Sequence, residues 1–310
     1  MFTVKEIATP TGILQYRTER HTGISCRISP ERLKRNLDNA HPVFDNGEDC
    51  PFCRENLFSA TPTFSDGSRL IRGESVTFPN LYPFGETHVV TVITCAHTVG
   101  EFSHTQIAEA LRGQVESLHD SEGYTSINWN YLPSAGASLI HPHMQGLSDS
   151  HPSPIMKKYI FAHDRHFQDC RRNYWDDVLE QERASDRYLF GDEIVWSAHA
   201  VPLGEREIRG ILPVSAISGL GPYTDLLAEG ILEIIAMYKK LGTRAFNMSV
   251  FFDKAGAGQK ISAFCSLISR INPNQKSTSD SAFMERLHLE PVIMTLPEEL
   301  GKFYREEKKK

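Results

Sequence analysis

The alternation of apolar and polar residues predicts the same order of elements in each half of the chain. In the first half, the apolar run over residues 88–94 (HVVTVIT) indicates a buried strand. Ser103 and Gln106 have the spacing of a capping box, and apolar residues at helical spacing extend the predicted helix to about Asp120. A strand over residues 125–131 follows, and a loop of small residues then leads to a further strand.

The second half repeats this order with an offset of about 120 residues, which is typical of an internal duplication. It predicts a strand, a helix that Gly242 ends, and two more strands, over residues 208–214, 226–238, 246–252 and 261–271. Residues 151–190 are polar, charged and aromatic, which suits a linker that packs across both halves. We therefore expect an α+β protein with two tandem repeats, residues 1–150 and 191–310, each a mostly antiparallel sheet packed with a helix.

The composition narrows the classes of protein that fit. The 310 residues are 40% hydrophobic and 23% charged, which is typical of a soluble globular protein with a real core. The formal net charge of −6 argues against a nucleic-acid partner. No apolar run approaches the roughly 20 residues that cross a bilayer, so no membrane partner is expected. The N-terminus lacks a signal pattern and the cysteines are scattered, so we expect a cytoplasmic location.

One short motif carries the candidate chemistry. His141, His143 and Gln145 alternate along an extended segment, so their side chains can point into one pocket. Residues 134–138 (SAGAS) have little side-chain bulk, which lets backbone amides approach a phosphate closely. The motif predicts chemistry at phosphorus with histidine as the nucleophile. The alternative is a pair of surface histidines in a turn that contains proline.

Cys50 and Cys53 form a CxxC pair with three possible meanings: half of a metal site, a redox pair, or coincidence. The turn-like residues 45–49 before it disfavour the redox interpretation, so a zinc site is the better hypothesis. Zinc then needs two more ligands. His141 and His97 are the candidates, and His88 and His104 are rivals for the second place.

The segment from Asn130 to Gln145 resembles the active-site signature of galactose-1-phosphate uridylyltransferases, a branch of the histidine-triad superfamily. In that family an asparagine stands eleven residues before a His-Pro-His-x-Gln sequence, and the spacing here is the same. Three further stretches resemble the family in the right order: the arginine motif over residues 29–35, the zinc CxxC, and the nucleoside-contacting segment over residues 78–83.

The resemblance implies a role for each matching residue. It implies one structural zinc bound by Cys50, Cys53, His97 and His141. It implies that His143 is the nucleophile and that Gln145 hydrogen-bonds the transferred phosphoryl group. It also implies a set of substrate-binding residues: Asn130, Gly136 and Ser138 at the phosphate, Arg32 and Arg35 as nearby positive charge, and Asn80 beside the nucleoside. Members of the family often pair as dimers, so a homodimer is expected.

These roles describe a nucleotidyltransferase. It would move a nucleoside monophosphate, expected to be UMP, between a nucleotide sugar and a phosphorylated small molecule through a covalent nucleotidyl-His143 intermediate. Gln145 stands where hydrolases of the superfamily have a third histidine, and an amide cannot act as an acid or base toward water, so transfer is favoured. Two alternatives remain: a phosphorylase or hydrolase of nucleotide sugars or dinucleoside polyphosphates, and a non-catalytic nucleotide-binding protein.

The second half departs from the family pattern. Many members bind a second metal through one glutamate and three histidines; Glu182 matches the glutamate, but residues 264–269 lack histidine, so we predict that this second metal is absent. Residues 281–288 resemble the sugar-contacting stretch only in a Phe-Met pair. The acceptor is therefore expected to differ from galactose 1-phosphate. The candidates to contact it are Arg286, His288 and Glu290; the alternative is an ordinary amphipathic segment.

Overall fold

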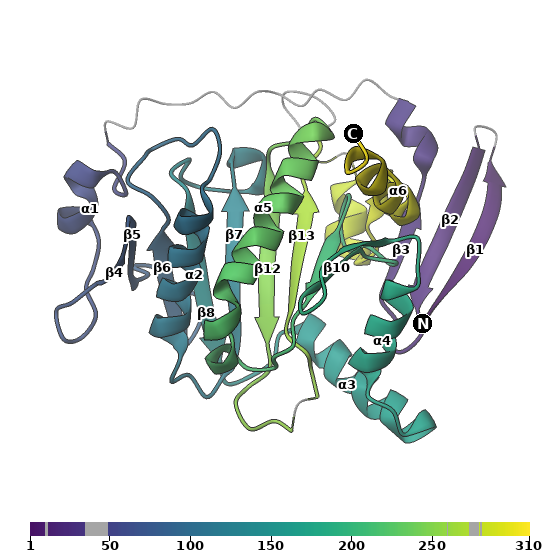
Figure 1. Ribbon diagram of the computed structural model, residues 1–310, viewed down its shortest axis with the longest axis horizontal. Coiled ribbons are helices and arrows are strands. Elements are labelled where there is room, and N and C mark those ends of the chain that lie inside the picture. Colours follow the sequence, from purple (N-terminus) through teal and green to yellow (C-terminus); the bar gives the residue numbers. More distant parts are fainter. Residues whose placement is uncertain (10–11, 35–48, 259, 273–278, 280) are drawn as a thin grey trace.

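A ten-stranded antiparallel sheet forms the body of the protein (Figure 1). The computed structural model describes residues 1–9, 12–34, 49–258, 260–272, 279 and 281–310. The strand order is β4-β5-β6-β8-β7-β12-β13-β11-β10-β9. The bounds are β4 Leu70–Arg72, β5 Ser75–Pro79, β6 Thr87–Val92, β7 Tyr124–Tyr131, β8 His143–Asp149, β9 Tyr188–Phe190, β10 Val195–Ala198, β11 Ile208–Ile211, β12 Phe246–Phe252 and β13 Phe264–Ser269. The first half of the chain therefore supplies one side of the sheet and the second half the other, and β7 and β12 join them.

Two long helices cover one face of this sheet. Helix α2 (His104–Leu118) begins at the predicted capping box, in which Ser103 and Gln106 each bond the other's backbone. Helix α5 (Thr224–Lys240) lies beside it (Figure 1). Their apolar stripes pack on alternate sheet residues in one large core. Gly146 allows this close approach, because a Cβ atom there would lie 2.1 Å from the Oε1 atom of Gln114.

The opposite face is covered differently in the two halves. In the second half, helices α3 (Pro154–Cys170) and α4 (Tyr174–Arg183) pack on it with a second sheet. The order of this sheet is β1-β2-β3-β14, with bounds Phe2–Thr9, Gly12–Glu19, Ser25–Ile28 and Val292–Ile293. In the first half, α1 (Arg54–Ala60) and its neighbouring loop are the described segments that lie there. Helix α6 (Pro297–Glu307) lies near β9 and β10. The candidate site lies on the less covered half of this face.

The predicted elements compare closely with the observed ones. The strand over 246–252 is confirmed, and those over 88–94 and 125–131 are confirmed to within two residues. The segment predicted as a linker contains α3 and α4, whose aromatic residues Tyr159 and Trp175 are buried. The strand over 261–271 is shorter than predicted, because its pairing with β12 extends only over residues 264–269. The division into two domains stays a prediction.

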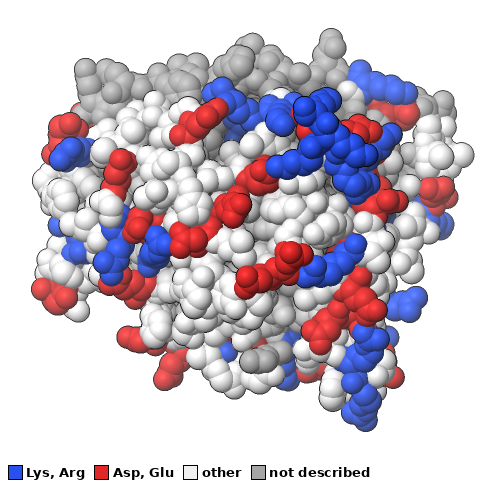
Figure 2. All heavy atoms as spheres, viewed as in Figure 1, with Lys and Arg blue, Asp and Glu red and all other residues white. Residues whose placement is uncertain are grey.

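The face of the molecule that carries α2 and α5 bears mixed charges (Figure 2). Basic side chains gather around the end of α5 and the C-terminus, where they pair with acids: Lys239 with Glu101, Lys240 with Glu307, and Lys308 with Glu233. Paired charges of this kind form a solvated surface. Among the described residues, no helix is both long and apolar enough to cross a membrane.

Candidate functional site

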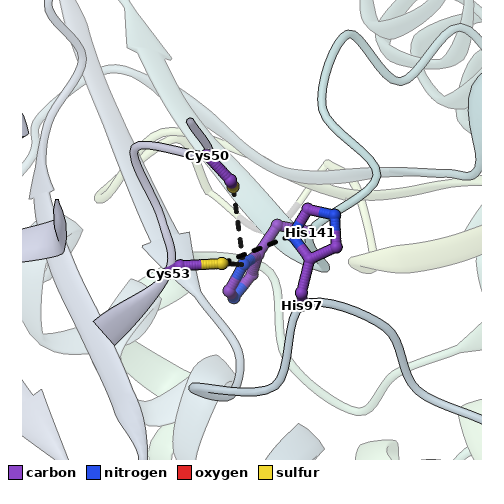
Figure 3. A group of neighbouring side chains, drawn as sticks. All are labelled: Cys50, Cys53, His97 and His141. Atoms are coloured by element: carbon purple, nitrogen blue, oxygen red, sulfur yellow. Dashed lines mark hydrogen bonds between the residues drawn. The ribbon is translucent and has the colours of Figure 1, made fainter. Parts of the chain in front are cut away.

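Four side chains from three separate segments of the chain meet beside the start of β8: Cys50, Cys53, His97 and His141 (Figure 3). The Sγ atom of Cys53 lies 3.4 Å from Nδ1 of His97 and 3.7 Å from Nδ1 of His141. The Sγ atom of Cys50 also lies 3.7 Å from Nδ1 of His141. These are the four residues that the sequence predicts as a metal site.

The spacing of these ligand atoms fits zinc. In a tetrahedral shell with ordinary Zn–S and Zn–N bonds, a sulfur and a nitrogen ligand lie about 3.6 Å apart. The observed separations of 3.4 to 3.7 Å agree with that value. Two thiols and two imidazoles are also the donor set that zinc prefers in structural sites. The cluster is thus suited to hold a zinc ion in a closed shell.

The surrounding backbone orients His141 for this role. Its Nε2–H donates to the carbonyl oxygen of Thr94 at 2.7 Å, which leaves the lone pair of Nδ1 toward the cysteines. His141 is fully buried, and this burial lowers the pKa of its imidazole. A neutral ring whose second nitrogen is held by a carbonyl is the form that binds a metal. Cys53 is the N-cap of α1, so the start of that helix positions its thiol.

His143 opens β8 and faces away from α2. Its Nδ1–H donates to the carbonyl oxygen of His141 at 2.8 Å, so the tautomer with its lone pair on Nε2 is favoured. The side chain is 7% exposed, and burial lowers the pKa of the imidazole. The ring of Phe52 meets it edge to face at 5.2 Å. His143 is therefore a neutral, oriented imidazole, which is the form that acts as a nucleophile.

His88, a rival for the zinc in the sequence, lies instead beside Gln145. The backbone N–H of Phe84 points to Nδ1 of His88 at 3.4 Å, so Nε2 carries the proton and donates to Oε1 of Gln145 at 2.9 Å. In this tautomer the 3.0 Å contact between Nδ2 of Asn80 and Nε2 brings two N–H groups together, so it is not a hydrogen bond. The oxygen of Gln145 is thus held by protein, which leaves its amide nitrogen to donate to a substrate. His104, the other rival, lies at the start of α2 and contacts the carbonyl oxygen of Asp225.

The loop of small residues follows β7 and contains the short helix η2 (Pro133–Ala135). Gly136 has a φ of +86°, a left-handed conformation that favours glycine. Asn247 on β12 belongs to the same region, although the sequence did not predict it. Its Nδ2 donates to Oδ1 of Asn130 and to the carbonyl oxygen of Ala135, both at 2.7 Å. Asn247 thus ties the predicted phosphate residue Asn130 to the loop; the signal for it was an amide within a mostly apolar strand.

The remaining predicted substrate residues lie around this face. Ser138 is exposed in the loop. Arg32 lies in η1 (Pro30–Lys34) and lines a small pocket that Asn247 also lines. The prediction for Arg35 lies outside the described residues.

The second-half candidates have protein partners or lie at the surface. Arg187 binds the carboxylate of Glu182, with nitrogen–oxygen distances of 2.7 and 3.2 Å. Glu290 pairs with Arg27 at 2.8 Å. Arg286 and His288 are exposed on the short π-helix η5 (Met284–His288). An ion pair with Arg187 therefore occupies the glutamate that matches a metal ligand of the family.

Comparison with known proteins places this geometry in a known fold. No family model matches the chain. An uncharacterised protein of Archaeoglobus fulgidus is 27% identical over 267 residues, which cover 83% of this chain and 81% of that protein.

Solved structures extend the comparison to nearly the whole chain. An ADP-glucose phosphorylase from Arabidopsis thaliana, with bound ADP-glucose, superposes with a TM-score of 0.74 at 18% identity and covers 94% of this chain and 99% of its own. A GalT-like protein from the same plant has a TM-score of 0.73 at 17% identity, with 94% and 98% covered. A uridylyltransferase has a TM-score of 0.70 at 17% identity, with 94% and 97% covered. The chain therefore has the fold of the uridylyltransferase and GalT-like structures, as the resemblance in its sequence implies.

Proposed function

We propose that this protein is a nucleotidyltransferase of the galactose-1-phosphate uridylyltransferase type. It transfers a nucleoside monophosphate between a nucleotide sugar and a phosphorylated acceptor through an adduct on His143. The observation that carries the proposal is the state of His143: a buried, neutral ring whose Nδ1–H is held by a backbone carbonyl at 2.8 Å. That bond aims the lone pair of Nε2 and stabilises the positive charge that develops on the ring during attack.

The reaction has two balanced steps. In the first, Nε2 of His143 attacks the α-phosphorus; an N–P bond forms, and the bond from this phosphorus to the bridging oxygen breaks. The sugar phosphate leaves with that electron pair. In the second, a phosphate oxygen of the acceptor attacks the same phosphorus and the N–P bond breaks, which returns the lone pair to Nε2. Gln145 donates from its amide nitrogen to the phosphoryl group and supplies no acid or base for water.

The neighbouring residues bind and orient the substrate. Asn130 and the loop that contains Gly136 and Ser138 lie at the phosphates, and Asn247 fixes the loop to β7 and β12. Asn80 lies at the nucleoside end, beside His88. A zinc ion bound by the cluster that includes His141 would hold the start of β8, and hence the aim of His143, in a structural role.

Three wider predictions accompany this proposal. The two halves of the chain are proposed to be tandem repeats, because the strand order is symmetric about the β7–β12 pair. UMP as the transferred group and a homodimer as the assembly follow from the resemblance alone. A cytoplasmic location follows from the lack of a signal pattern in the sequence.

Isotope exchange tests the covalent mechanism. With a nucleotide sugar present, labelled hexose 1-phosphate should exchange into it without any other acceptor, because the first step is reversible and needs none. His143→Ala should abolish this exchange, whereas the matched control His104→Ala, at an exposed histidine, should retain it. Net turnover without exchange in the wild type, across UDP-, ADP- and GDP-sugars, would overturn the proposal.

Phosphorolysis is a second candidate, because the structure with a TM-score of 0.74 is an ADP-glucose phosphorylase. In phosphorolysis, this chain would form the same adduct on His143 and transfer it to orthophosphate. The two candidates differ in one measurement. Turnover that depends on a sugar phosphate favours transfer, and turnover with orthophosphate alone favours phosphorolysis.

A further inference from the structure

A second cluster of potential metal ligands lies at the hairpin between α3 and α4, away from the candidate active site. It consists of His166 and Cys170 on the last two turns of α3 and Asp177 on the first turn of α4. His166 and Cys170 are four residues apart, so they share one side of the helix. The tight connection between the helices, in which Arg171 is left-handed, brings Asp177 back to that side.

Both neighbours of His166 converge on the same ring nitrogen. Oδ2 of Asp177 lies 2.7 Å from its Nε2, and Sγ of Cys170 lies 3.2 Å from the same atom. A Cys-His-Asp catalytic triad would instead place the thiol and the carboxylate at opposite nitrogens of the ring. In the structure the 2.7 Å contact is a hydrogen bond from Nε2–H to the carboxylate. Once that proton is lost, three ligand atoms meet at one point, which is the arrangement of a metal shell.

His166 and Asp177, the two more buried ligands, each have a further contact that orients the side chain. Nδ1 of His166 lies 3.4 Å from Nε2 of His21, so a proton on Nδ1 leaves Nε2 for a metal. The other carboxylate oxygen of Asp177 lies 2.6 Å from Nε of Arg172, which fixes the orientation of the carboxylate. Outer contacts of this kind orient the ligands of known metal sites.

The three side chains of the cluster are exposed to solvent to different extents. The His166 side chain is 9% exposed and that of Asp177 14%, whereas Cys170 lies at the surface. An ion could therefore enter from the Cys170 side. In a tetrahedral shell a nitrogen and an oxygen ligand lie about 3.4 Å apart, so the 2.7 Å between His166 and Asp177 must widen by less than 1 Å.

We propose that His166, Cys170 and Asp177 form a zinc site with three protein ligands and a water molecule on the solvent side. Zinc suits this set, because one thiolate, one imidazole and one carboxylate are all among its usual ligands. The site is separate from Glu182, whose carboxylate Arg187 holds. The ion cross-links the two helices that cover the second half of the sheet, so its role is structural. The proposal is independent of the proposed function.

Alkylation of the wild-type chain tests the site without any substitution. Cys95 and Cys170 are the exposed cysteines of the described chain, so each reports on its own surroundings in one sample. A metal-bound thiolate reacts slowly with iodoacetamide. Zinc added to metal-stripped protein should slow the alkylation of Cys170 by about tenfold or more, whereas Cys95 should change far less. Equal rates for Cys170 with and without zinc would overturn the proposal.

Stoichiometry provides the second measurement. Elemental analysis of the zinc-saturated chain should give one equivalent more for the wild type than for Cys170→Ser combined with Asp177→Asn. The matched control Cys95→Ser should keep the wild-type content. An unchanged content in the double variant, with its fold verified by circular dichroism, would contradict the site.

Discussion

The two sides of the ten-stranded sheet share one frame of strands but carry different chemistry. The order β6-β8-β7 on one side mirrors the order β11-β13-β12 on the other. One row of paired residues crosses the middle of the sheet on the same face: Val90, Gln145, Asn128, Ser249, Ser266 and Arg209. Positions equally far from the β7–β12 pair can therefore be compared directly.

Corresponding positions on the two sides carry different types of residue. His143 opposite Val92 on one side corresponds to Phe264 opposite Ile211 on the other. His88, which holds Gln145, corresponds to Glu207. The backbone repeats this correspondence, because Asn80 N–H bonds the carbonyl of His88 at 2.8 Å and His199 N–H bonds that of Glu207 at 2.9 Å.

The polar residues of the second side contribute to stability, whereas those of the first side form the candidate site. On the second side, Glu207 pairs with Arg209 at 3.1 Å and accepts a bond from Ser266 at 2.7 Å, while α3 and α4 cover them. These charges neutralise one another and are sealed from solvent. On the first side, Gln145 and Asn130 are only half-buried. The hydrogen bond of the His143 ring to the carbonyl oxygen of His141 uses Nδ1–H and does not involve the lone pair of Nε2. The same strands thus support a site on one side and a closed ion pair on the other.

The largest expected effect is on the exchange rate, and it should differ between substitutions at the corresponding positions His143 and Phe264. His143→Ala should lower the exchange rate by about 10⁴-fold or more, because it removes the proposed nucleophile. Phe264→Leu should leave exchange nearly unchanged and lower the free energy of unfolding by about 1–2 kcal/mol through poorer packing. Exchange rates and urea unfolding measured on both variants check this. A loss of exchange in Phe264→Leu would break the comparison.

Loss of the metal site beside His143 is the next largest effect. Cys50→Ala combined with Cys53→Ala should bind one zinc fewer than the wild type and lose about 4 kcal/mol or more of stability. Glu207→Gln should cost about 3–5 kcal/mol through its broken ion pair, yet keep the full zinc content. Elemental analysis with chemical unfolding distinguishes them. Wild-type zinc content in the cysteine variant would refute the assigned ligands.

A pH effect of intermediate size concerns the second side. Burial, with Arg209 and Arg187 nearby, holds the pKa of His199 well below its usual value. The unfolded chain takes up this proton first, so the stability that neutral His199 contributes is complete above about pH 6.5 and is lost as the pH falls. His199→Asn should therefore reduce the loss of unfolding free energy between pH 7 and 5 by about 1 kcal/mol or more.

Glu19 and His104 also bear on the interpretation of this pH dependence. Glu19 lies 3.8 Å from His199, and burial raises the pKa of its carboxyl, so its contribution to stability changes with pH in the opposite direction. His104→Asn, at an exposed histidine, is the matched control and should keep the wild-type slope. The same slope in His199→Asn as in wild type would show that this histidine is not held neutral.

The smallest effect lies where the two sides meet. Asn247→Ala removes the bonds to Asn130 and to the loop carbonyl of Ala135, and should lower the transfer rate by about tenfold. Ser249→Ala removes only the bond to Asn128, two residue pairs along the same strands, and should change the rate less. Steady-state kinetics on both variants decides whether the loop depends on Asn247.

The sequence predicted what local patterns encode. The capping box at Ser103 and Gln106 and the strand over 246–252 depend on neighbouring residues, and the structure contains both. The four residues of the metal cluster could be named because the donor types and the family spacing restrict the choice. The partner of Asn130 could not be read, because the pairing of β7 with β12 joins residues 117 positions apart. The sequence does not distinguish the α3–α4 hairpin from a linker, because its aromatic residues are interspersed with charges.

The most direct test of the central claim is the site of covalent modification. Mass spectrometry of the intact chain, after mixing with nucleotide sugars and removing the released sugar phosphate, should find one nucleotidyl group per chain. Peptide mapping should locate it on His143, and His143→Ala should carry none. A chain that turns over substrate without an adduct, or with the adduct on another residue, would contradict the account.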